Sequence, residues 1–398
     1  MPPTLDEQLR TLTWNAAEVV PADALADKLR SGRPLRVKLG LDPTADHVTL
    51  GWSVVLRKLR SFQELGHTAV LIVGDFTARI GDPSELDKTR PMLTKEQVDE
   101  HAQRVLDQFF SILDEERTEV RRNSEWLEAL GVAGLLELAS HQTVAHTLGR
   151  DDFARRYASG APISLREFIY PLLQGYDSVA VQADVEIGGT DQHFNLLVGR
   201  DLQRAMGQDP QAVLTMPLIE GTDGVRKMAQ SLGNYIGITE PAEEIFGKVM
   251  SIPDELMGKY FRLATDRSEA DIAAMERENT RPEQLKRALA RDIVRLYHGE
   301  EAAEAAALRF DEIFVEDKIP DDVPENAIPD TSINGGSVYV PRLLSDLGLA
   351  ESTSAGRRLI SQGGVYIDGA RLDSEELELT AARGRVVSVG KRRFVRLM

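Results

Sequence analysis

Apolar positions in the first eighty residues follow two different spacings. Residues 35–41 and 68–73 are mainly apolar runs with the length and composition of buried strands. Between them the apolar residues have the period of a helix with one buried face: Trp52, Val55, Leu56, Leu59 and Phe62. Gly66 follows as a helix-ending glycine. The pattern predicts an α/β fold with a doubly wound parallel sheet, whose ligands bind at the carboxyl ends of the strands.

Later segments have a different pattern. Residues 241–314 are charged, are rich in Ala, Glu, Arg and Leu, and show little strand signal, which predicts a small all-α domain. Residues 319–336 are rich in proline, acidic residues and glycine, which predicts a linker. Two short helices, at 340–349 and 354–361, and a hairpin turning at Asp368-Gly369 are expected after it. The predicted division is a catalytic domain at 1–235, a helical domain at 236–318, the linker at 319–336 and a C-terminal domain at 337–398.

Composition and charge restrict the possible chemistry. The 398 residues are 42% hydrophobic and include no cysteine, so a full core is possible and thiol chemistry is excluded. The seven histidines contain no i,i+4 pair, and we expect no metal site in the protein. The polar N-terminus and the lack of a long apolar run predict a cytoplasmic protein without a membrane span. The net charge is −17, yet residues 337–398 carry ten Lys or Arg against seven Asp or Glu, which indicates that only this end meets a phosphate backbone.

Five motifs follow one another along the chain. The first, GLDPTADHVTLGW at 40–52, joins the first predicted strand to its helix, whose N-terminus could face phosphate, although close helix packing explains Gly51 equally well. The others are GDFTARIGDPS at 74–84, YPLLQGYD at 170–177, IGGTDQ at 187–192 and KMAQSLGNY at 227–235. In this order they resemble the motifs of the bacterial tyrosyl-tRNA synthetases, a class I aminoacyl-tRNA synthetase family, and the resemblance covers essentially the whole chain.

This resemblance implies a Rossmann-like catalytic domain, a helical anticodon-side domain and an RNA-binding domain of the ribosomal protein S4 type. It implies that ATP, with Mg²⁺, activates L-tyrosine as tyrosyl-adenylate, and that tyrosine is then transferred to tRNA(Tyr). Tryptophanyl enzymes share the fold, but GGTDQ, Asp177 and the S4-like tail argue against that specificity. The family also forms homodimers through a segment that corresponds to roughly 113–148, although apolar residues there are equally consistent with domain core.

The resemblance assigns the tyrosine pocket. Tyr170, Gln174 and Asp177 are spaced i, i+4 and i+7, a helical stripe that is more often a solvated face. In the family the residue matching Asp177 accepts a hydrogen bond from the substrate phenol. Lys38 stands where many relatives have a tyrosine that shares the phenol, so Asp177 is expected to be its main partner. The other expected contacts are Tyr170, Gln174, Asp82 and Asn123 at the ammonium and Gln192 at the carboxylate.

The resemblance also assigns the ATP site. The expected nucleotide contacts are Asp42, Gly51, Trp52, Gly189, Asp191, Lys227 and Gln230. Trp52 also lies on the buried stripe of its helix, so core packing is an alternative role. The expected catalytic donors toward the phosphates are Thr44, Thr49, Lys227, Gln230 and Arg90, with Lys88 beside Arg90.

Both ATP signatures depart from the family pattern. His-x-Gly-His is Thr49-Leu50-Gly51-Trp52, and the second lysine of Lys-Met-Ser-Lys-Ser is Gln230. The chemistry needs donors aimed at phosphate charge, which hydroxyls and an amide supply less strongly than charged groups. One such replacement should cost ~1–3 kcal/mol at the transition state, so a slower activation step is expected. The alternative is a catalytically impaired paralogue that acts as an RNA-binding protein, although an intact tyrosine pocket favours the enzyme.

Basic residues of the tail are the expected RNA contacts. Arg357 and Arg358 precede the predicted hairpin, as in S4-type modules, and a basic cluster ends the chain. Arg358 could equally be a surface salt-bridge partner. The expected set is Arg357, Arg358, Lys391, Arg392 and Arg393.

Overall fold

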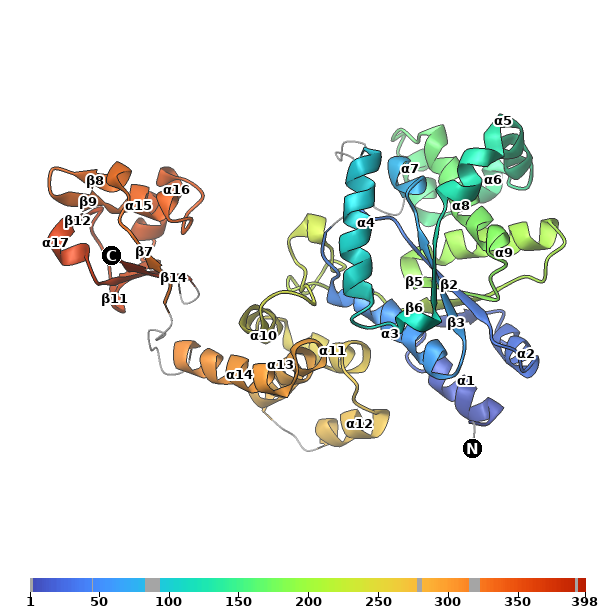
Figure 1. Cartoon of the computed structure of the whole chain (residues 1–398), viewed down its shortest axis with the longest axis horizontal. Helices are drawn as coiled ribbons and strands as arrows, with labels where there is room; N and C mark the ends of the chain where they lie inside the picture. Colours follow the sequence, from blue (N-terminus) through green and yellow to red (C-terminus); the bar gives the residue numbers. More distant parts are fainter. Residues whose placement is uncertain (1–2, 45, 83–93, 278–280, 315–322, 391–392) are drawn as a thin grey trace. The chain divides into compact units, whose positions relative to one another are not determined.

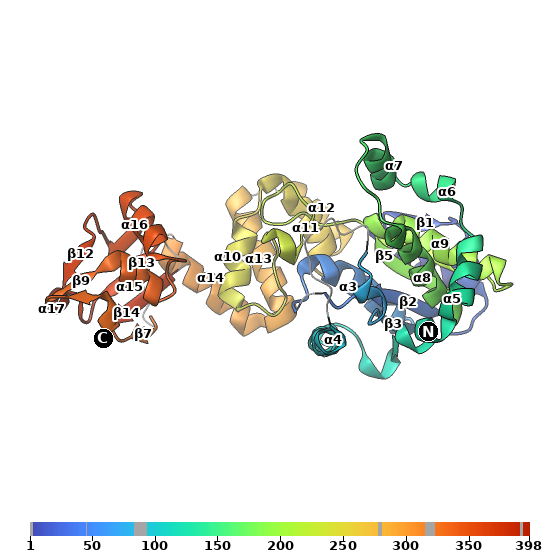
Figure 2. The ribbon, with the colours of Figure 1, turned by 90° about the horizontal axis from the view of Figure 1, so that it is seen from above.

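The computed structural model describes residues 3–44, 46–82, 94–277, 281–314, 323–390 and 393–398. It divides into two compact units, Met1–Tyr297 and His298–Met398 (Figures 1 and 2). No helix within these described ranges is long and apolar enough to cross a membrane.

A six-stranded sheet forms the centre of the N-terminal unit (Figure 1). Its order is β1-β6-β5-β2-β3-β4, and all neighbours are parallel except β1, which pairs antiparallel with β6. The strands are β1 (Glu18–Val20), β2 (Arg36–Leu41), β3 (Thr68–Val73), β4 (Thr118–Arg122), β5 (Val185–Gly189) and β6 (Ala212–Met216). The predicted doubly wound, Rossmann-like sheet is therefore confirmed.

Strand β2 marks the point where the strand order changes direction. From β2 the chain continues to β3 and β4 on one side, whereas β5 and β6 add on the other side. Because parallel crossovers are right-handed, helices on the two sides cover opposite faces, and a crevice remains at the carboxyl ends of β2 and β5. The register pairs β2 with β5 at Val37–Val185 and Lys38–Glu186, so their ladder covers the amino-terminal ends and stops before the carboxyl ends.

Helix α3 (Leu50–Glu64) is the helix that the apolar spacing predicted. Leu56, Leu59 and Phe62 are fully buried, and Thr49 caps the N-terminus. The helix ends before Gly66, whose φ of +90° is a conformation that glycine adopts without strain. This glycine lets the chain turn directly into β3.

The other helices of the N-terminal unit surround the sheet or follow it in sequence. α8 and α9 pack along each other, and α9 packs on β5 and β6 (Figure 2). Helices α10 to α13 confirm the helical segment predicted after the sheet, and Tyr260 of α11 donates a 2.6 Å hydrogen bond to the carbonyl of Glu220. The bounds are α1 (Leu5–Thr13), α2 (Ala24–Arg30), α4 (Lys95–Phe109), α5 (Ser124–Ser140), α6 (Val144–Leu148), α7 (Asp151–Ala158), α8 (Leu165–Ala180), α9 (His193–Ala205), α10 (Ala242–Met250), α11 (Met257–Ala264), α12 (Glu269–Arg277) and α13 (Pro282–His298).

The C-terminal unit has its own core, which includes Val338, Leu343, Leu344 and Val387. It contains α14 (Glu300–Phe314), α15 (Val340–Asp346), α16 (Thr353–Ser361) and α17 (Leu379–Ala382). A five-stranded sheet has the order β11-β10-β13-β14-β7, and a three-stranded sheet has the order β12-β9-β8. The strands are β7 (Glu325–Asn326), β8 (Ile333–Asn334), β9 (Ser337–Tyr339), β10 (Val365–Ile367), β11 (Ala370–Arg371), β12 (Glu376–Glu378), β13 (Val386–Val389) and β14 (Arg393–Leu397).

Two local predictions for this unit have different outcomes. The hairpin turns at Asp368-Gly369, where φ values of +47° and +80° match a two-residue hairpin turn. The turn-rich composition predicted a linker up to residue 336. Instead, β7 pairs with β14 and β8 pairs with β9, so residues 325–326 and 333–334 belong to the C-terminal sheets. Composition did not reveal this, because strands of two residues have no periodicity.

Candidate active site

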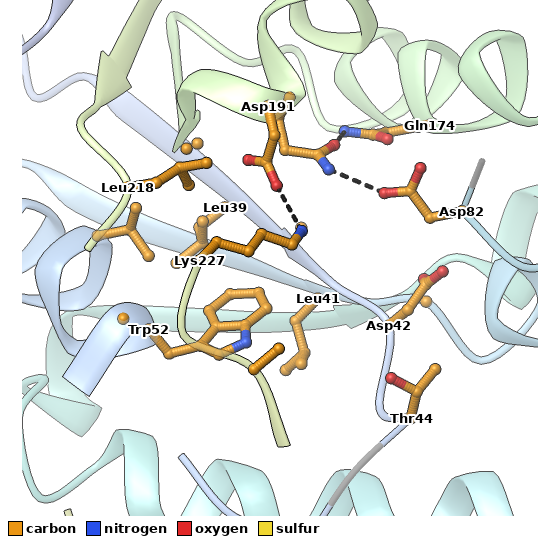
Figure 3. Close-up of a pocket in the computed structure, with 18 of the residues that line it drawn as sticks. Leu39, Leu41, Asp42, Thr44, Trp52, Asp82, Gln174, Asp191, Leu218 and Lys227 are labelled. Atoms are coloured by element: carbon orange, nitrogen blue, oxygen red, sulfur yellow. Dashed lines mark hydrogen bonds and ion pairs between the residues drawn. The ribbon is translucent and has the colours of Figure 1, made fainter. Parts of the chain in front are cut away.

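A cavity of about 740 Å³ opens at the carboxyl ends of the central strands (Figure 3). With the exception of Arg90 and Lys88, which lie outside the described residues, the structure brings together at this cavity every site residue expected in the first two domains. These are Asp42, Thr44, Thr49, Gly51, Trp52, Asp82, Asn123, Tyr170, Gln174, Asp177, Gly189, Asp191, Gln192, Lys227 and Gln230.

Asp177 is a buried carboxyl group on α8, with 3% of its surface exposed. Trp126 Nε1 donates to its Oδ1 at 2.8 Å, and Asn123 Nδ2 donates to its Oδ2 at 3.3 Å. Burial raises the pKa of Asp177 to about 7, against the opposing effects of the Lys38 charge and the two donors. A fixed, ionisable acceptor in a dry site is suited to binding a single hydroxyl group.

Asn123 lies beside Asp177. Its amide nitrogen donates to Thr77 Oγ1 at 2.9 Å as well as to Asp177, and its Oδ1 accepts the backbone N–H of Phe76 at 3.0 Å. The side chain is fully buried. Asn123 therefore supports Asp177, and its expected contact with the ammonium stays a prediction.

A cluster of side-chain amides and one carboxylate lines the same cavity as Asp177. Gln192 Nε2 donates to Asp82 at 2.8 Å, and Gln174 Nε2 donates to Gln192 Oε1 at 3.3 Å (Figure 3). The buried Asn195 orients both glutamines by donating to each Oε1, at 3.0 and 3.1 Å. Tyr170 donates to Asp42 at 2.9 Å. Several acceptors thus converge where a ligand ammonium could bind.

Lys38 is fully buried in β2. Its ammonium donates to the carbonyl of Gln174 at 2.9 Å and to Ser178 Oγ at 2.8 Å, and it forms an ion pair with Glu186 Oε1 at 2.8 Å. Lys38 therefore fastens α8 to the sheet, which leaves Asp177 as the expected partner of a phenol.

The first signature forms the N-terminus of α3. Thr49 Oγ1 accepts the N–H of Trp52 at 3.4 Å and still has its own proton to donate. The indole of Trp52 lines the cavity and also lies 5.9 Å from the ring of Phe109, so both roles considered for Trp52 are compatible with its position. The N–H of Leu50 bonds to the carbonyl of Ile236, which ties this segment to the chain just after the second signature.

The second signature reaches the cavity through two side chains. Lys227 Nζ lies 2.9 Å from Asp191 Oδ2, and Trp52 projects into the same space (Figure 3). Gln230 donates through its amide to the carbonyl of His47, just before Thr49. Gly189 permits close approach, since a Cβ there would lie 2.6 Å from Asp191 Oδ1. The two signatures are thus in direct contact.

Three hydrogen-bonding residues of this site were missed by reasoning from sequence: the buried Thr77 and Asn195 and the half-buried Trp126. Thr77 lies within a quoted motif, but no residue spacing distinguished its hydroxyl from those of other threonines. Trp126 lies three positions after Asn123 and Asn195 three positions after Gln192, and a motif of adjacent letters misses such neighbours. A search for polar residues one helical turn from each expected site residue would have found both.

The expected RNA residues of the C-terminal unit differ in their surroundings. Arg357 pairs with Glu375 at 3.1 Å and donates to Tyr339 Oη, and both contacts raise the pKa of its guanidinium. Arg358 and Arg393 line an open cavity of about 310 Å³. Within the described part of the chain Arg358 has no ion-pair partner, so the alternative of a surface salt bridge applies to Arg357 instead. Lys391 and Arg392 lie outside the described residues.

Comparison with known proteins gives a consistent result. Residues 30–315 match the model of class I tRNA synthetases (W and Y), and residues 340–381 match the S4 domain. The tyrosine–tRNA ligase of Thermotoga maritima is 50% identical over 398 residues, covering 99% of this chain and 98% of the relative. That of Shewanella oneidensis is 49% identical over 396 residues, covering 99% and 98%.

Solved structures agree at the level of the fold. The tyrosyl-tRNA synthetase of Archaeoglobus fulgidus, complexed with L-tyrosine, has a TM-score of 0.61 at 23% identity and covers 76% of this chain and 100% of its own. A truncated mitochondrial tyrosyl-tRNA synthetase of Aspergillus nidulans has a TM-score of 0.63 at 22% identity, covering 78% and 94%. Since its curated relatives share about half of its residues over nearly the full length, this chain belongs to the tyrosine–tRNA ligase family of class I tRNA synthetases.

Proposed function

We propose that the cavity binds L-tyrosine and ATP side by side, forms tyrosyl-adenylate and pyrophosphate, and then transfers tyrosine to the 3′ end of tRNA(Tyr). The observation that carries this proposal is the buried Asp177, which accepts hydrogen bonds from Trp126 and Asn123. Asp177 lies on the same face of α8 as Gln174 and Tyr170. These positions span one to two helical turns, roughly 5–10 Å, which is the scale of one aromatic amino acid.

Tyrosine then lies with its two polar ends in different surroundings. The phenol donates to Asp177, while the ammonium binds among Tyr170, Gln174 and Asp82. Gln192, which is already bonded to Asp82, is near enough to donate to the substrate carboxylate. A phenylalanine would leave the buried Asp177 carboxyl without its partner, which supplies the selectivity.

On the ATP side the chain's residues supply hydrogen-bond donors and positive charge. We assign Lys227, Thr44, Thr49, Gln230 and Arg90 to the phosphates, where negative charge develops as the tyrosine carboxylate attacks the α-phosphate. Asp191 and Gly189 approach the ribose, and Asp42, Gly51 and Trp52 complete the nucleotide side. Lys227 must exchange its bond with Asp191 for phosphate as ATP enters.

We assign Mg²⁺ to the ATP phosphates and not to a site built by the protein. The described residues contain no group of three His, Cys, Asp or Glu side chains that could hold a metal ion, and Mg²⁺ commonly binds through substrate phosphates. For this reason none of the steps above passes through the metal.

We also propose macromolecular partners and a cellular location for the protein. The C-terminal unit binds the tRNA backbone, with Arg358 and Arg393 as the preferred contacts because they line an open cavity. Two copies associate through the segment at 113–148, and the protein works in the cytoplasm, where tRNA is charged.

Tyrosine-dependent exchange of pyrophosphate into ATP tests this function. The purified chain should exchange with tyrosine and only weakly with phenylalanine. Asp177→Ala should raise the KM for tyrosine roughly 10- to 150-fold, since a hydrogen bond to a charged group is worth ~1.5–3 kcal/mol. If tRNA bound but no exchange occurred, the paralogue that acts only as an RNA-binding protein would be the better description.

A further inference from the structure

A continuous chain of hydrogen bonds connects the two ends of the proposed tyrosine site. Thr77 Oγ1 donates to Asp42 Oδ1 at 2.7 Å, and Asn123 Nδ2 donates to Thr77 Oγ1 at 2.9 Å. The same amide nitrogen donates to Asp177 at 3.3 Å, and Tyr170 donates to the other oxygen of Asp42 at 2.9 Å. Thr77, Asn123 and Asp177 are all at most 3% exposed, so little water competes for these bonds.

The direction of each bond in this chain is fixed. The N–H of Phe76 needs an acceptor, and Asn123 Oδ1 provides it at 3.0 Å, so the Asn123 nitrogen must face Thr77 and Asp177. The opposite amide orientation would direct an oxygen at a carboxylate and a donor at a donor. The Thr77 oxygen accepts from Asn123, and the Thr77 hydroxyl donates its hydrogen bond to Asp42. Thr77 is therefore the one link that accepts on one side and donates on the other.

These bonds join elements that are distant in sequence. Asp42 follows β2, Thr77 lies just after β3, and Asn123 follows β4, so the links run across the carboxyl ends of three adjacent strands. Both ends of the chain of bonds then meet α8, at Tyr170 and at Asp177. The rotation and depth of α8 relative to the sheet, which set the distance between the two ends of the tyrosine site, are thereby tied to Thr77.

We propose that Thr77 is a positioning residue that couples the ammonium end of the tyrosine site to its phenol end and so contributes to the selection of tyrosine over phenylalanine. The proposal rests on the proposed function, because it takes Asp177 as the phenol's partner. Gly74 is consistent with it: a Cβ there would lie 1.9 Å from Asp42 Oδ1 and 2.4 Å from Thr77 Oγ1. The space beside Gly74 is thus filled by the Asp42–Thr77 hydrogen bond.

The test compares Thr77→Val, which keeps the shape but removes both hydrogen bonds, with Thr77→Ser, which keeps the hydroxyl. Pyrophosphate exchange is measured with tyrosine and with phenylalanine on the full-length protein. Thr77→Val should raise the KM for tyrosine about 10- to 100-fold and lower the tyrosine-to-phenylalanine ratio of kcat/KM at least about tenfold. Thr77→Ser should restore tyrosine selectivity.

Thr215→Val is the matched control. Thr215 is a buried threonine of β6, and its hydroxyl makes no hydrogen bond within the described residues. This variant should keep the selectivity of the unaltered protein. If Thr77→Val does not fold, Thr77→Ala and Thr77→Ser are compared in the same assay and should differ in the same way.

The possible failures are distinguishable. An unaltered protein without tyrosine-dependent exchange would overturn the proposed function itself. If the unaltered protein exchanges and Asp177→Ala loses selectivity, but Thr77→Val behaves as the unaltered protein, only the coupling is refuted. A Thr77→Ser protein as damaged as Thr77→Val would also refute it, because the hydroxyl would then not be the cause.

Discussion

At the scale of single residues, Asp177 shows how burial and hydrogen bonding oppose each other. A carboxyl group away from water favours its neutral form, whereas Trp126, Asn123 and the nearby Lys38 charge favour the carboxylate. The balance places the pKa of Asp177 at about 7, instead of near its ordinary value of 3.8. The group that we assign to the phenol therefore changes its charge close to physiological pH.

This position of the pKa predicts a pH dependence for tyrosine but not for phenylalanine. A carboxyl whose pKa is raised takes up its proton as the pH falls through about 7, and the protonated form is a weaker acceptor for the phenol. The kcat/KM for tyrosine should therefore level off about one unit above this pKa and decline toward tenfold per pH unit below it. Stopped-flow measurement of adenylate formation between pH 5.5 and 8.5 would show this.

Two comparisons make the measurement decisive. The same profile for phenylalanine, which has no hydroxyl to donate, should lack the step near pH 7. Asp177→Asn, which cannot titrate, should flatten the profile for tyrosine. A step that persists in Asp177→Asn would assign the titration to another group.

At the scale of elements, the α3 N-terminus and the 227–231 loop act as one unit. Gln230 bonds to the carbonyl of His47, and Leu50 bonds to Ile236, so each signature supports the other. The positive dipole end of a helix attracts phosphate, and Lys227 adds a full charge to the same space. The two replaced signatures therefore keep their donors but have less positive charge.

The change Gln230→Lys tests whether the lost charge limits activation. A lysine at 230 would return a cation to the phosphates as charge develops on them, so kcat for adenylate formation should rise about 3- to 30-fold, or ~0.6–2 kcal/mol, with little change in ATP binding. Pyrophosphate exchange measures the rate, and Gln230→Met, which has similar size and no donor, serves as the control and should be slower. A lower rate in a folded Gln230→Lys protein would mean that the site depends on the glutamine bond to His47.

Much of the fold could be predicted at this scale from local pattern. The strand at 68–73 and the preceding helix α3 follow from apolar spacing, and the 368–369 turn follows from an Asp-Gly pair. Strands β7 and β8 could not be predicted, because two residues hold no period and their pairing partners are distant in sequence. Asn123 is a similar case, because its contact with Asp177 joins residues distant in sequence and only tertiary structure shows it.

At the scale of the whole molecule, the net charge of the C-terminal residues differs in sign from that of the rest of the chain. The chain as a whole carries −17 and residues 337–398 carry a net of +3. A chain that ends at residue 322 should bind tRNA more weakly and with a flatter salt dependence, because fewer phosphates are neutralised. Its rate of adenylate formation should be nearly unchanged, since the cavity lies wholly in the N-terminal unit. The cut is placed before β7, because β7 pairs with β14.

Two single-residue variants serve as controls for this truncation experiment. Arg358→Gln should reduce the slope of log affinity against log salt by about one, whereas Arg357→Gln, whose charge is already paired with Glu375, should reduce it less. Filter binding of tRNA at several salt concentrations measures both. Equal affinity of truncated and full-length chains would exclude the C-terminal unit as the RNA contact.

Assembly is the last property of the whole molecule that the structure helps to predict. In the segment expected to form a dimer, Leu127 and Leu138 of α5 are buried in their own unit, but Val132 and Leu136 are 76% and 67% exposed. Val132 and Leu136 are spaced i, i+4 and therefore share one exposed face of α5. A shared apolar face indicates an interface better than a single exposed apolar residue, which is common on protein surfaces. The combined change Val132→Asp with Leu136→Asp should therefore convert a dimer to a monomer of 44.1 kDa in light scattering at micromolar concentration. Val225→Asp, at an 82% exposed position outside this segment, is the control and should leave the dimer intact. A mass of 44.1 kDa for the unaltered protein would exclude the dimer, and the exposed face of α5 would then need another partner.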